Sequence, residues 1–370
     1  MSETPIQLPE RLDLISPYTP IEPYEVLSER LGFAPEELTK MDANENPYGI
    51  SPKARQALAE LRYPHIYPDP ESRALRSALA TYCGVPMESI MASSGADELI
   101  DLILRACLKP DEKVLICPPT FGMYSFDTLI NSGQVVEARR TDDFQLDLPL
   151  IRQKVETEQP KILFITCPNN PDGSLPSPET MQMLLDLPLL VVVDEAYIEF
   201  TTDGGRLGEN LSLIREVEKR QNLVVLRTFS KWAGLAGLRV GYGAFPSWLM
   251  PALWKIKQPY NVNVAGTQAA LASLNDLDWL AANVASLREE RERLFLALTK
   301  IPYLRPWPSQ TNFILCRVVG RPAAELKNTL AQKGVLVRYY TSKGLADCVR
   351  VSVGRPQDTE RLVKALEELS

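Results

Sequence analysis

The sequence predicts an α/β protein with a mostly parallel sheet flanked by helices and a smaller α/β domain at the C-terminal end. Two observations predict this class. Between residues 51 and 281, short apolar segments rich in Val, Ile and Leu alternate with segments of helical periodicity. These apolar segments are nearly continuous, as strands buried on both faces of a parallel sheet must be.

The predicted elements of the larger part follow in chain order. Helical spacing predicts helices over 51–61, 72–84 and 93–108. We expect the second helix to stop at Gly84, and we expect a serine to cap the third, which has Asp97 and Glu98 in its first turn. Bounded apolar segments predict strands within 113–119, 134–140, 161–168, 189–198, 222–229 and 239–245.

The character of the chain changes after about residue 275. Residues 279–301 have the pattern of a long amphipathic helix, and we interpret its charge run as a solvated face. Strands over 311–318, 335–340 and 348–354, with helices over 322–334 and 358–369, then predict a βαββα unit. We therefore predict an N-terminal segment (1–50) that joins the small domain, a large domain (51–281) and a small domain (282–370).

Composition narrows the class of protein. The formal net charge of the 370 residues is −7 and no basic cluster is visible, which argues against nucleic acid as a partner. A small anionic substrate remains compatible, because arginines can gather in one pocket of an acidic protein. The six cysteines are scattered with no CxxC pair, which is typical of reduced cysteines in a core.

One histidine, His65, is present, and it lies in a proline-rich stretch that predicts a loop. A histidine triad or a histidine-based metal site would depend on it alone, so we expect no metal site and another group for proton transfer. The N-terminal stretch has no apolar segment typical of a signal peptide, and no apolar run is long enough for a membrane span. We therefore expect a cytoplasmic protein, with the plastid as the alternative.

Polar side chains follow several predicted strands where each strand ends. Asn169 and Asn170 follow one strand, Asp194 ends another, and Lys231 follows a third after Ser230. Ligands of open α/β sheets bind beyond the carboxyl ends of strands. Each residue alone is more often a turn, cap or surface charge. Neither a GxGxxG motif after a strand nor a GxxxxGK[ST] motif is present, so the nucleotide-binding motifs are missing.

Together, however, these residues match the chemical needs of pyridoxal phosphate. The cofactor requires a lysine amine, a carboxylate for its ring nitrogen and a site for its phosphate. Lys231 and Asp194 provide the first two. A helix N-terminus with nearby polar and cationic side chains provides the third, and two further side chains can hydrogen-bond the phenolic oxygen of the ring. The predicted phosphate residues are Ala96, Asp97, Ser230 and Arg239, and the predicted phenolic-oxygen residues are Asn170 and Tyr197.

Several motifs in register carry a resemblance to a known family. The stretches SSGADELI, CPPTFGMY, CPNNPDG, VVDEAYIEF and RTFSKWAGLAGLRVGYG resemble fold-type I pyridoxal-phosphate aminotransferases. The stretches MDANENPYG, YPDPESRALR, KQPYNVNV, SQTNFIL and CVRVSVG resemble the histidinol-phosphate aminotransferases among them, in particular the plant-like branch. The resemblance covers the chain from about residue 16 to the last helix, and it implies a mostly parallel sheet of seven strands.

The resemblance also implies roles for individual residues. Lys231 is expected to hold the cofactor covalently and then to move the proton during transamination. Phe121 stands where the family stacks a tyrosine on the cofactor, so a hydroxyl is lost but the aromatic face remains. Tyr67 is expected to reach the cofactor phosphate of the neighbouring subunit, which implies a homodimer with shared active sites. The N-terminal segment (1–50) is expected to join the interface of this dimer as well as the small domain.

The implied substrates are histidinol phosphate and 2-oxoglutarate, which give imidazole-acetol phosphate and glutamate in histidine biosynthesis. Guanidinium groups accept both phosphate and carboxylate. By resemblance, Arg338 and Arg350 are these anion-binding groups, with help from Tyr18 and Asn44, whereas Arg355 is expected at the surface. The alternatives are an aromatic amino-acid aminotransferase, a threonine-phosphate decarboxylase and a non-catalytic relative, the last disfavoured because Lys231 and Asp194 are both present.

Overall fold

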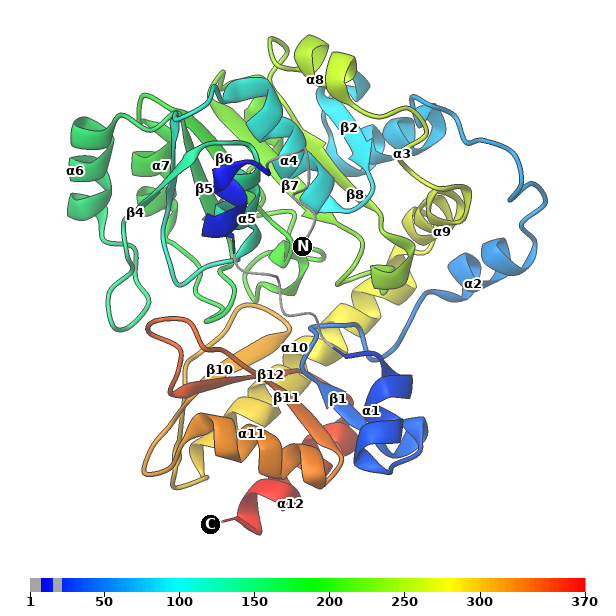
Figure 1. Cartoon of the computed structure of the whole chain (residues 1–370). Coiled ribbons are helices and arrows are strands. Elements are labelled where there is room, and N and C mark those ends of the chain that lie inside the picture. Colours follow the sequence, from blue (N-terminus) through cyan, green and yellow to red (C-terminus); the bar gives the residue numbers. More distant parts are fainter. Residues whose placement is uncertain (1–7, 16–21, 370) are drawn as a thin grey trace, which may run out of the picture.

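The computed structural model describes residues 8–15 and 22–369. The chain forms two sheets, one above the other in Figure 1, and a long helix that runs past both. The upper sheet has seven strands in the order β2-β8-β7-β6-β5-β3-β4. The strands are β2 (Ile90–Ser93), β3 (Lys113–Ile116), β4 (Gln134–Glu137), β5 (Ile162–Thr166), β6 (Leu190–Asp194), β7 (Leu223–Thr228) and β8 (Gly241–Ala244).

Most of this sheet is parallel, as predicted. Only β8 runs antiparallel to its two neighbours, β2 and β7. The six predicted strands are confirmed. Strand β2 was not predicted, because its four residues directly precede a strong helical pattern and are too few to show a period of their own.

Helices cover both faces of the seven-stranded sheet. Apolar side chains of α4 (Ala96–Cys107), α5 (Met123–Ile130) and α8 (Met250–Ile256) pack on one face. The other face packs against α3 (Arg73–Cys83), α6 (Leu148–Glu158), α7 (Pro178–Leu185) and α9 (Val264–Leu274), and α2 (Pro52–Ala59) lies beside α9. This two-sided burial explains why the central strands β5 and β6 are nearly continuous apolar runs rather than alternating ones.

Two of the predicted helix ends can be compared with the structure. Gly84 ends α3 in the left-handed conformation, with φ +69°, as predicted. The predicted serine cap of α4 is wrong, because the N-cap residue is Gly95, with φ +79°. The Ser93 hydroxyl instead donates to the Gly95 carbonyl, and the Ser94 N–H donates to the carboxylate of Glu98. The backbone turn into this helix therefore requires glycine rather than a side-chain cap.

The smaller sheet has five strands in the order β1-β11-β12-β10-β9. They are β1 (Thr39–Met41), β9 (Leu304–Pro306), β10 (Phe313–Val318), β11 (Val335–Tyr339) and β12 (Cys348–Ser352), with helices α1 (Tyr24–Leu31), α11 (Ala323–Gln332) and α12 (Pro356–Glu367). The predicted βαββα unit is confirmed as β10-α11-β11-β12-α12. Strand β1 pairs in parallel with β11, so the N-terminal segment adds an edge strand to the C-terminal unit.

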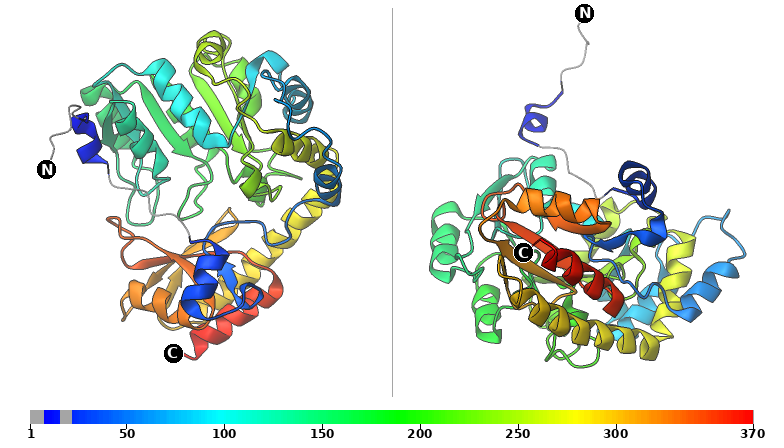
Figure 2. Two further views of the ribbon diagram at one scale, coloured as in Figure 1. Left: turned by 45° about the vertical axis from the view of Figure 1, so that its right-hand side comes forward. Right: turned by 90° about the horizontal axis from the view of Figure 1, so that it is seen from below.

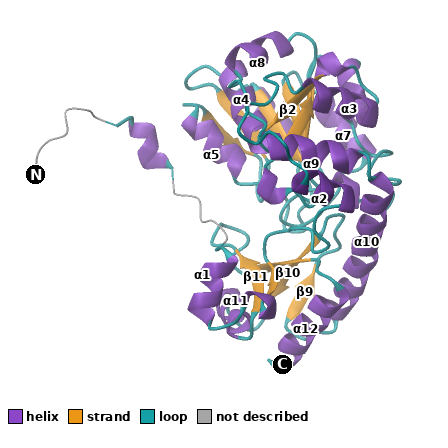
Figure 3. Ribbon diagram, turned by 90° about the vertical axis from the view of Figure 1, so that its right-hand side faces the viewer, coloured by secondary structure: helices purple, strands orange, loops and turns teal. Residues whose placement is uncertain are grey.

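Helix α10 (Leu277–Thr299) links the two sheets along one side of the molecule (Figure 2, Figure 3). The predicted boundary between residues 281 and 282 lies inside this helix, and the division into domains stays a prediction. The charge run of α10 is not only a solvated face, because Glu290 and Arg291 are buried. The Arg291 guanidinium donates to the carbonyls of Phe200 and Thr311, which ties the helix to the main chain on both sides.

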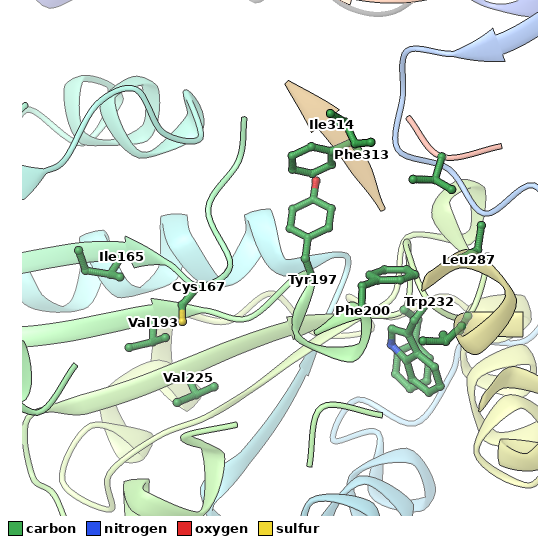
Figure 4. Close-up of a cluster of buried hydrophobic side chains, with 14 of the residues drawn as sticks. Ile165, Cys167, Val193, Tyr197, Phe200, Val225, Trp232, Leu287, Phe313 and Ile314 are labelled. Carbon is green, nitrogen blue, oxygen red and sulfur yellow. The ribbon is translucent and has the colours of Figure 1, made fainter. Parts of the chain in front are cut away.

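Aromatic packing also joins the two sheets. Tyr197, from the loop after β6, meets Phe313 of β10 edge-on, with ring centroids 5.1 Å apart (Figure 4). Trp232 and Phe200 lie nearby in the same buried cluster. The loops at the carboxyl ends of the parallel strands therefore face the smaller sheet. Short 3₁₀ helices occur at Glu10–Leu14, Pro35–Glu37, Met87–Ser89, Ile198–Phe200, Ile214–Glu218 and Ala236–Leu238.

The remaining sequence predictions concern single residues. His65 lies in an exposed loop, as predicted. The six cysteines form no disulfide; Cys107 is half-buried and the other five are buried, as expected of core cysteines. Across the described chain, every helix is too short or too polar to cross a lipid bilayer.

Candidate active site

A cavity of about 140 Å³ lies at the carboxyl ends of the parallel strands, beside the N-terminus of α4. The chain brings together at this cavity nine of the ten residues predicted to bind the cofactor: Ala96, Asp97, Phe121, Asn170, Asp194, Tyr197, Ser230, Lys231 and Arg239. They come from five separate segments of the sequence. The fold therefore assembles the residue types that the sequence analysis selected.

Asp194 is the last residue of β6, and its carboxylate is buried. One oxygen accepts a hydrogen bond of 2.7 Å from the Tyr124 hydroxyl, and the other accepts one of 3.0 Å from the Ala196 N–H. Burial raises the pKa of Asp194 to about 6, and these two donors oppose the shift. Among the described residues, no cation forms an ion pair with this carboxylate. It is therefore a buried acceptor suited to a cationic N–H.

Lys231 follows β7 by three residues, and its amine faces the same cavity. Within the described chain, the amine makes no hydrogen bond or ion pair, and it lies 6.0 Å from the centre of the Tyr197 ring. Burial lowers the pKa of Lys231 to about 8, and the Arg350 cation acts in the same direction. A buried amine with a lowered pKa is more often neutral, which is the form that can act as a nucleophile or a base.

The other end of the cavity is built to hold an anion. The N-terminal N–H groups of α4 lie beside Arg239, whose guanidinium donates 2.9 Å to Asp97. A Cβ atom added at Gly95 would meet the Arg239 guanidinium at 2.5 Å, and one added at Gly241 would meet the Ala96 nitrogen at 2.4 Å. Both glycines are needed for this close approach of cation and helix N-terminus, which together attract phosphate.

A larger cavity of about 600 Å³ adjoins the first one and shares Phe121, Asn170, Tyr197 and Lys231 with it. Arg338 on β11 and Arg350 on β12 line its other side. The two arginines are direct partners across this antiparallel strand pair, so both guanidiniums project from the same face of the smaller sheet. The larger cavity thus lies between the two sheets, with Lys231 on one side and two arginines on the other.

Arg350 is buried and held in place from both sheets. Its guanidinium donates 2.7 Å to the Asn170 side chain and 2.9 Å to the Asp42 carbonyl, and its Nε has no hydrogen-bond partner among the described residues. A buried donor without a partner is costly and is ready to bind an acceptor. Asn44 also lines this cavity, but its amide is committed to the Tyr197 hydroxyl and to Ser352.

Two other residues considered in the sequence, Tyr67 and Arg355, lie outside the two cavities. Tyr67 is 79% exposed and stacks on Tyr260, so the single chain does not bring it to the cavity, and its contact with a second subunit stays a prediction. Tyr18 lies outside the described residues. Arg355 is exposed, as predicted, and lies over the Tyr48 ring.

Tyr124 is the residue of the site that the sequence analysis missed. It is fully buried, bonds Asp194 directly and also contacts the Thr166 hydroxyl at 2.8 Å. Its place near the start of α5, three residues after Phe121, could have suggested that the two rings lie on the same side of the chain. Nothing in its sequence neighbourhood indicates a bond to Asp194, because that contact spans 70 residues.

The polar groups that line the smaller cavity fit pyridoxal phosphate. The buried carboxylate of Asp194 suits a protonated ring nitrogen, the amine of Lys231 suits an aldehyde, and the Arg239 end suits a phosphate. A model of the aminotransferase class I and II family matches residues 36–366. The chain belongs to this family and is a pyridoxal-phosphate-dependent transaminase.

Individual relatives narrow the comparison. The chain is 52% identical over 354 residues to the chloroplastic histidinol-phosphate aminotransferase of Nicotiana tabacum, covering 95% of this chain and 84% of that one. It is 49% identical over 364 residues to the histidinol-phosphate aminotransferase of Roseiflexus castenholzii, covering 96% of both. The crystal structure of histidinol-phosphate aminotransferase from Sinorhizobium meliloti, in complex with pyridoxal-5′-phosphate, superposes with a TM-score of 0.87 at 25% identity, covering 98% of each chain.

Proposed function

We propose that this protein is a histidinol-phosphate aminotransferase of histidine biosynthesis, which transfers the amino group between histidinol phosphate and 2-oxoglutarate. The observation that carries the proposal is the pair Arg338 and Arg350, which face Lys231 across the larger cavity. Histidinol phosphate carries a phosphate ester and glutamate carries carboxylates, so a site for both needs guanidiniums that accept either anion. Identity of about half along nearly the whole chain to relatives of that name supports the same function.

Each residue of the smaller cavity has a proposed task. When bound, pyridoxal phosphate supplies an aldehyde that takes up the amino group and a ring that delocalises the electron pair left when the Cα–H bond breaks. Asp194 holds the ring nitrogen protonated, and Phe121 stacks on the ring. Asn170 and Tyr197 hydrogen-bond the phenolic oxygen. The phosphate is held by the N–H groups at Ala96 and Asp97, by Ser230 and by Arg239.

Lys231 performs the proton transfer in this proposal. Its amine would hold the cofactor covalently in the absence of substrate. Once free, the amine would accept the proton from Cα of the substrate and return it to the cofactor carbon on the other side of the amino nitrogen. The lowered pKa keeps a useful fraction of the amine neutral near physiological pH. Arg338 and Arg350 hold the substrate anion, with Tyr18 as a further proposed contact. Asn44 acts through the hydrogen bond that orients the Tyr197 hydroxyl.

We also propose a homodimer with shared active sites. Tyr67 and Tyr260 form an exposed aromatic stack, and Tyr63 and Ile66 are exposed beside Tyr67 in the sequence. An exposed apolar patch of this kind is typical of an interface. For the compartment we propose the cytoplasm, with the plastid as the alternative because similar relatives are chloroplastic. Sedimentation of the purified protein and fractionation of its source cells test these two points.

The test of the function is a panel of half-reactions. Purified holoenzyme is mixed separately with histidinol phosphate, glutamate, phenylalanine and phosphothreonine, and the absorbance change of the cofactor is followed. We expect histidinol phosphate to convert the enzyme with a kcat/KM at least about tenfold above that of phenylalanine, which corresponds to about 1.4 kcal/mol.

Other outcomes of the panel would contradict the substrate assignment. A larger response to phenylalanine would identify an aromatic amino-acid aminotransferase, and carbon dioxide release from phosphothreonine would identify a decarboxylase. Borohydride reduction followed by peptide mapping should place the cofactor on Lys231. If the Lys231→Ala variant still attaches the cofactor covalently, the assignment of Lys231 as the cofactor-binding lysine is refuted.

A further inference from the structure

The larger cavity has an unusual balance of charge. Its described lining includes five cationic side chains and a single carboxylate, that of Glu137. The cations are Lys231, Arg139, Arg338, Lys343 and Arg350. A cavity that receives only phosphate and carboxylate groups gains nothing from a carboxylate, because like charges repel. Glu137 is therefore the one carboxylate in the described lining that a hydrogen-bond donor or a positive charge of a ligand could meet.

Glu137 lies at the end of β4, the edge strand of the seven-stranded sheet, opposite Ile116 on β3. One of its oxygens accepts a hydrogen bond of 3.1 Å from Arg139. The other oxygen has no hydrogen bond or ion pair within the described chain. The ion pair between Glu137 and Arg139 is partly exposed, with 47% of the Glu137 side chain accessible, so it contributes little to the stability of the fold. The Glu137 carboxylate therefore stays available to a ligand.

Arg139 links this carboxylate to the smaller sheet. Its guanidinium donates 2.9 Å to the Lys343 carbonyl, in the loop between β11 and β12. Glu137 is thus held at the point where the edge of the large sheet meets a loop of the small sheet. Next to it, Ile116, Pro118, Pro119 and Phe121 give the cavity an apolar wall against which a flat ring can pack.

If the proposed function holds, the substrate has three chemically distinct groups. The amine goes to Lys231 and the cofactor, and the phosphate goes to Arg338 and Arg350, which leaves the imidazole ring. We propose that Glu137 is a specificity-determining residue that accepts the imidazole N–H of the substrate, with the ring packed on the adjacent apolar wall. A carboxylate is the strongest acceptor for an imidazole N–H. The Glu137 carboxylate also attracts the imidazole ring when the ring is protonated and carries a positive charge.

This contact also explains how the site can reject aromatic amino acids of similar shape. A phenyl ring in the same place would cover the Glu137 carboxylate without offering it a donor. Sites built to hydrogen-bond a substrate group discriminate strongly against analogues that lack it, because the polar group of the protein is left unpaired. The preference for imidazole over phenyl should therefore depend on Glu137 and not on the arginines.

The experiment compares two substrates that differ only in the ring: histidinol phosphate and its phenyl analogue, 2-amino-3-phenylpropyl phosphate. Single-turnover kcat/KM values are measured for wild-type holoenzyme, Glu137→Ala and Glu137→Gln. We expect Glu137→Ala to reduce the preference for histidinol phosphate by about tenfold, mainly through KM. Glu137→Gln keeps an acceptor but loses the charge, so it should give a smaller reduction. Glu156→Ala, which removes an exposed glutamate of α6 outside the cavity, is the matched control.

The outcomes separate this inference from the proposed function. If wild-type enzyme does not respond to histidinol phosphate, the proposed function fails and this inference fails with it. If wild-type enzyme responds but Glu137→Ala keeps the same ratio between the two substrates, the function stands and the role of Glu137 is refuted. Equal losses for both substrates would also refute it, because they would show an effect on folding or on the charge of the whole cavity.

Discussion

Asp194, the last residue of β6, and Glu199 in the following loop are buried carboxylates that lie on opposite faces of the large sheet and have opposite surroundings. Asp194 faces the cofactor cavity and bonds only neutral donors, Tyr124 and a backbone N–H. Glu199, five residues later, pairs with the buried Arg227 at 2.8 Å, and Glu195 lies 3.9 Å from the same guanidinium. Burial raises the pKa of Asp194 to about 6 and that of Glu199 to about 7.

A functional and a structural buried acid differ in whether the chain itself supplies a cation. Glu199 forms an ion pair within the chain with Arg227, a cation that it shares with Glu195, so its charge has a partner once the protein has folded. Asp194 has none among the described residues, so its charge is balanced only when a ligand brings a cationic group. Both carboxylates are costly to bury, but only the cost of burying Asp194 is offset by ligand binding.

The largest expected effect follows from changing Asp194→Asn. The amide keeps the size of the side chain but cannot hold the cofactor ring nitrogen protonated. We expect kcat/KM for amino transfer to fall by about a thousandfold, or about 4 kcal/mol, as for other buried charge pairs that lose one partner. Steady-state kinetics with excess cofactor measure this effect.

The same substitution should stabilise the apoprotein. The folded-state pKa of Asp194 is raised, so folding is favoured by protonation, and the ionised form costs stability once the pH rises through about 6. A neutral amide at this position removes that cost, so denaturant unfolding should show a gain of up to about 3 kcal/mol at pH 8 that shrinks toward pH 4. A loss of stability at pH 8 would mean that Asp194 is a structural acid like Glu199.

Changing Arg227→Met tests the other face. We expect the free energy of unfolding to fall by about 3 kcal/mol, because Glu195 and Glu199 are left buried without a cation. Arg227 opposes the rise in the pKa of Glu199, so that pKa should rise further in the variant and the loss should be smaller at pH 6 than at pH 8.

The matched control for Arg227→Met is Arg105→Met. Arg105 forms an exposed pair with Asp101 at 2.7 Å on α4, and its loss should cost at most about 1 kcal/mol. Folded Arg227→Met protein should still attach the cofactor at Lys231. Normal stability combined with failure to bind cofactor would assign Arg227 to the site rather than to the fold.

Much of the fold could be predicted from the sequence, because strands buried on both faces leave a direct apolar signal. The segments around Val192 and Val225 are examples, since their neighbours on both faces are apolar and buried. Elements without such a signal were missed. Strand β1 is three residues long and owes its existence to pairing with β11, almost 300 residues away in the chain. A pairing of that separation leaves no local pattern.

The site shows the same limit. Lys231, Asp194 and Arg239 could be selected because each stands at the end of a strand or beside a run of small residues. The predicted serine cap at α4 failed because the N-cap residue is Gly95, whose backbone adopts φ +79° and whose missing Cβ leaves room for the Arg239 guanidinium. That approach joins segments far apart in the sequence, so no local pattern indicates it. Tyr124 was missed because its importance comes from a hydrogen bond across 70 residues.

The smallest expected effect, and the sharpest test of what keeps Asp194 ionised, comes from Tyr124→Phe. The Tyr124 hydroxyl is the largest factor that opposes the burial-driven rise in the pKa of Asp194. Removal of the hydroxyl should raise the pKa of Asp194 further. Protonated Asp194 no longer attracts the cationic ring nitrogen, so cofactor binding should weaken as the pH falls. In the variant this weakening should begin at a higher pH than in the wild type. Loss of one hydrogen bond to a buried charge predicts about a tenfold weaker affinity at about pH 6.

Tyr242→Phe is the matched control for Tyr124→Phe. The Tyr242 hydroxyl is equally buried but has no hydrogen-bond partner among the described residues, and its ring lies 5.9 Å from the Arg227 guanidinium on the other side of the sheet. Titration of cofactor binding from pH 5 to pH 8 should therefore shift for Tyr124→Phe and not for Tyr242→Phe. A shift in both would mean that the two faces of the sheet are electrostatically coupled, and the distinction between Asp194 and Glu199 would fail.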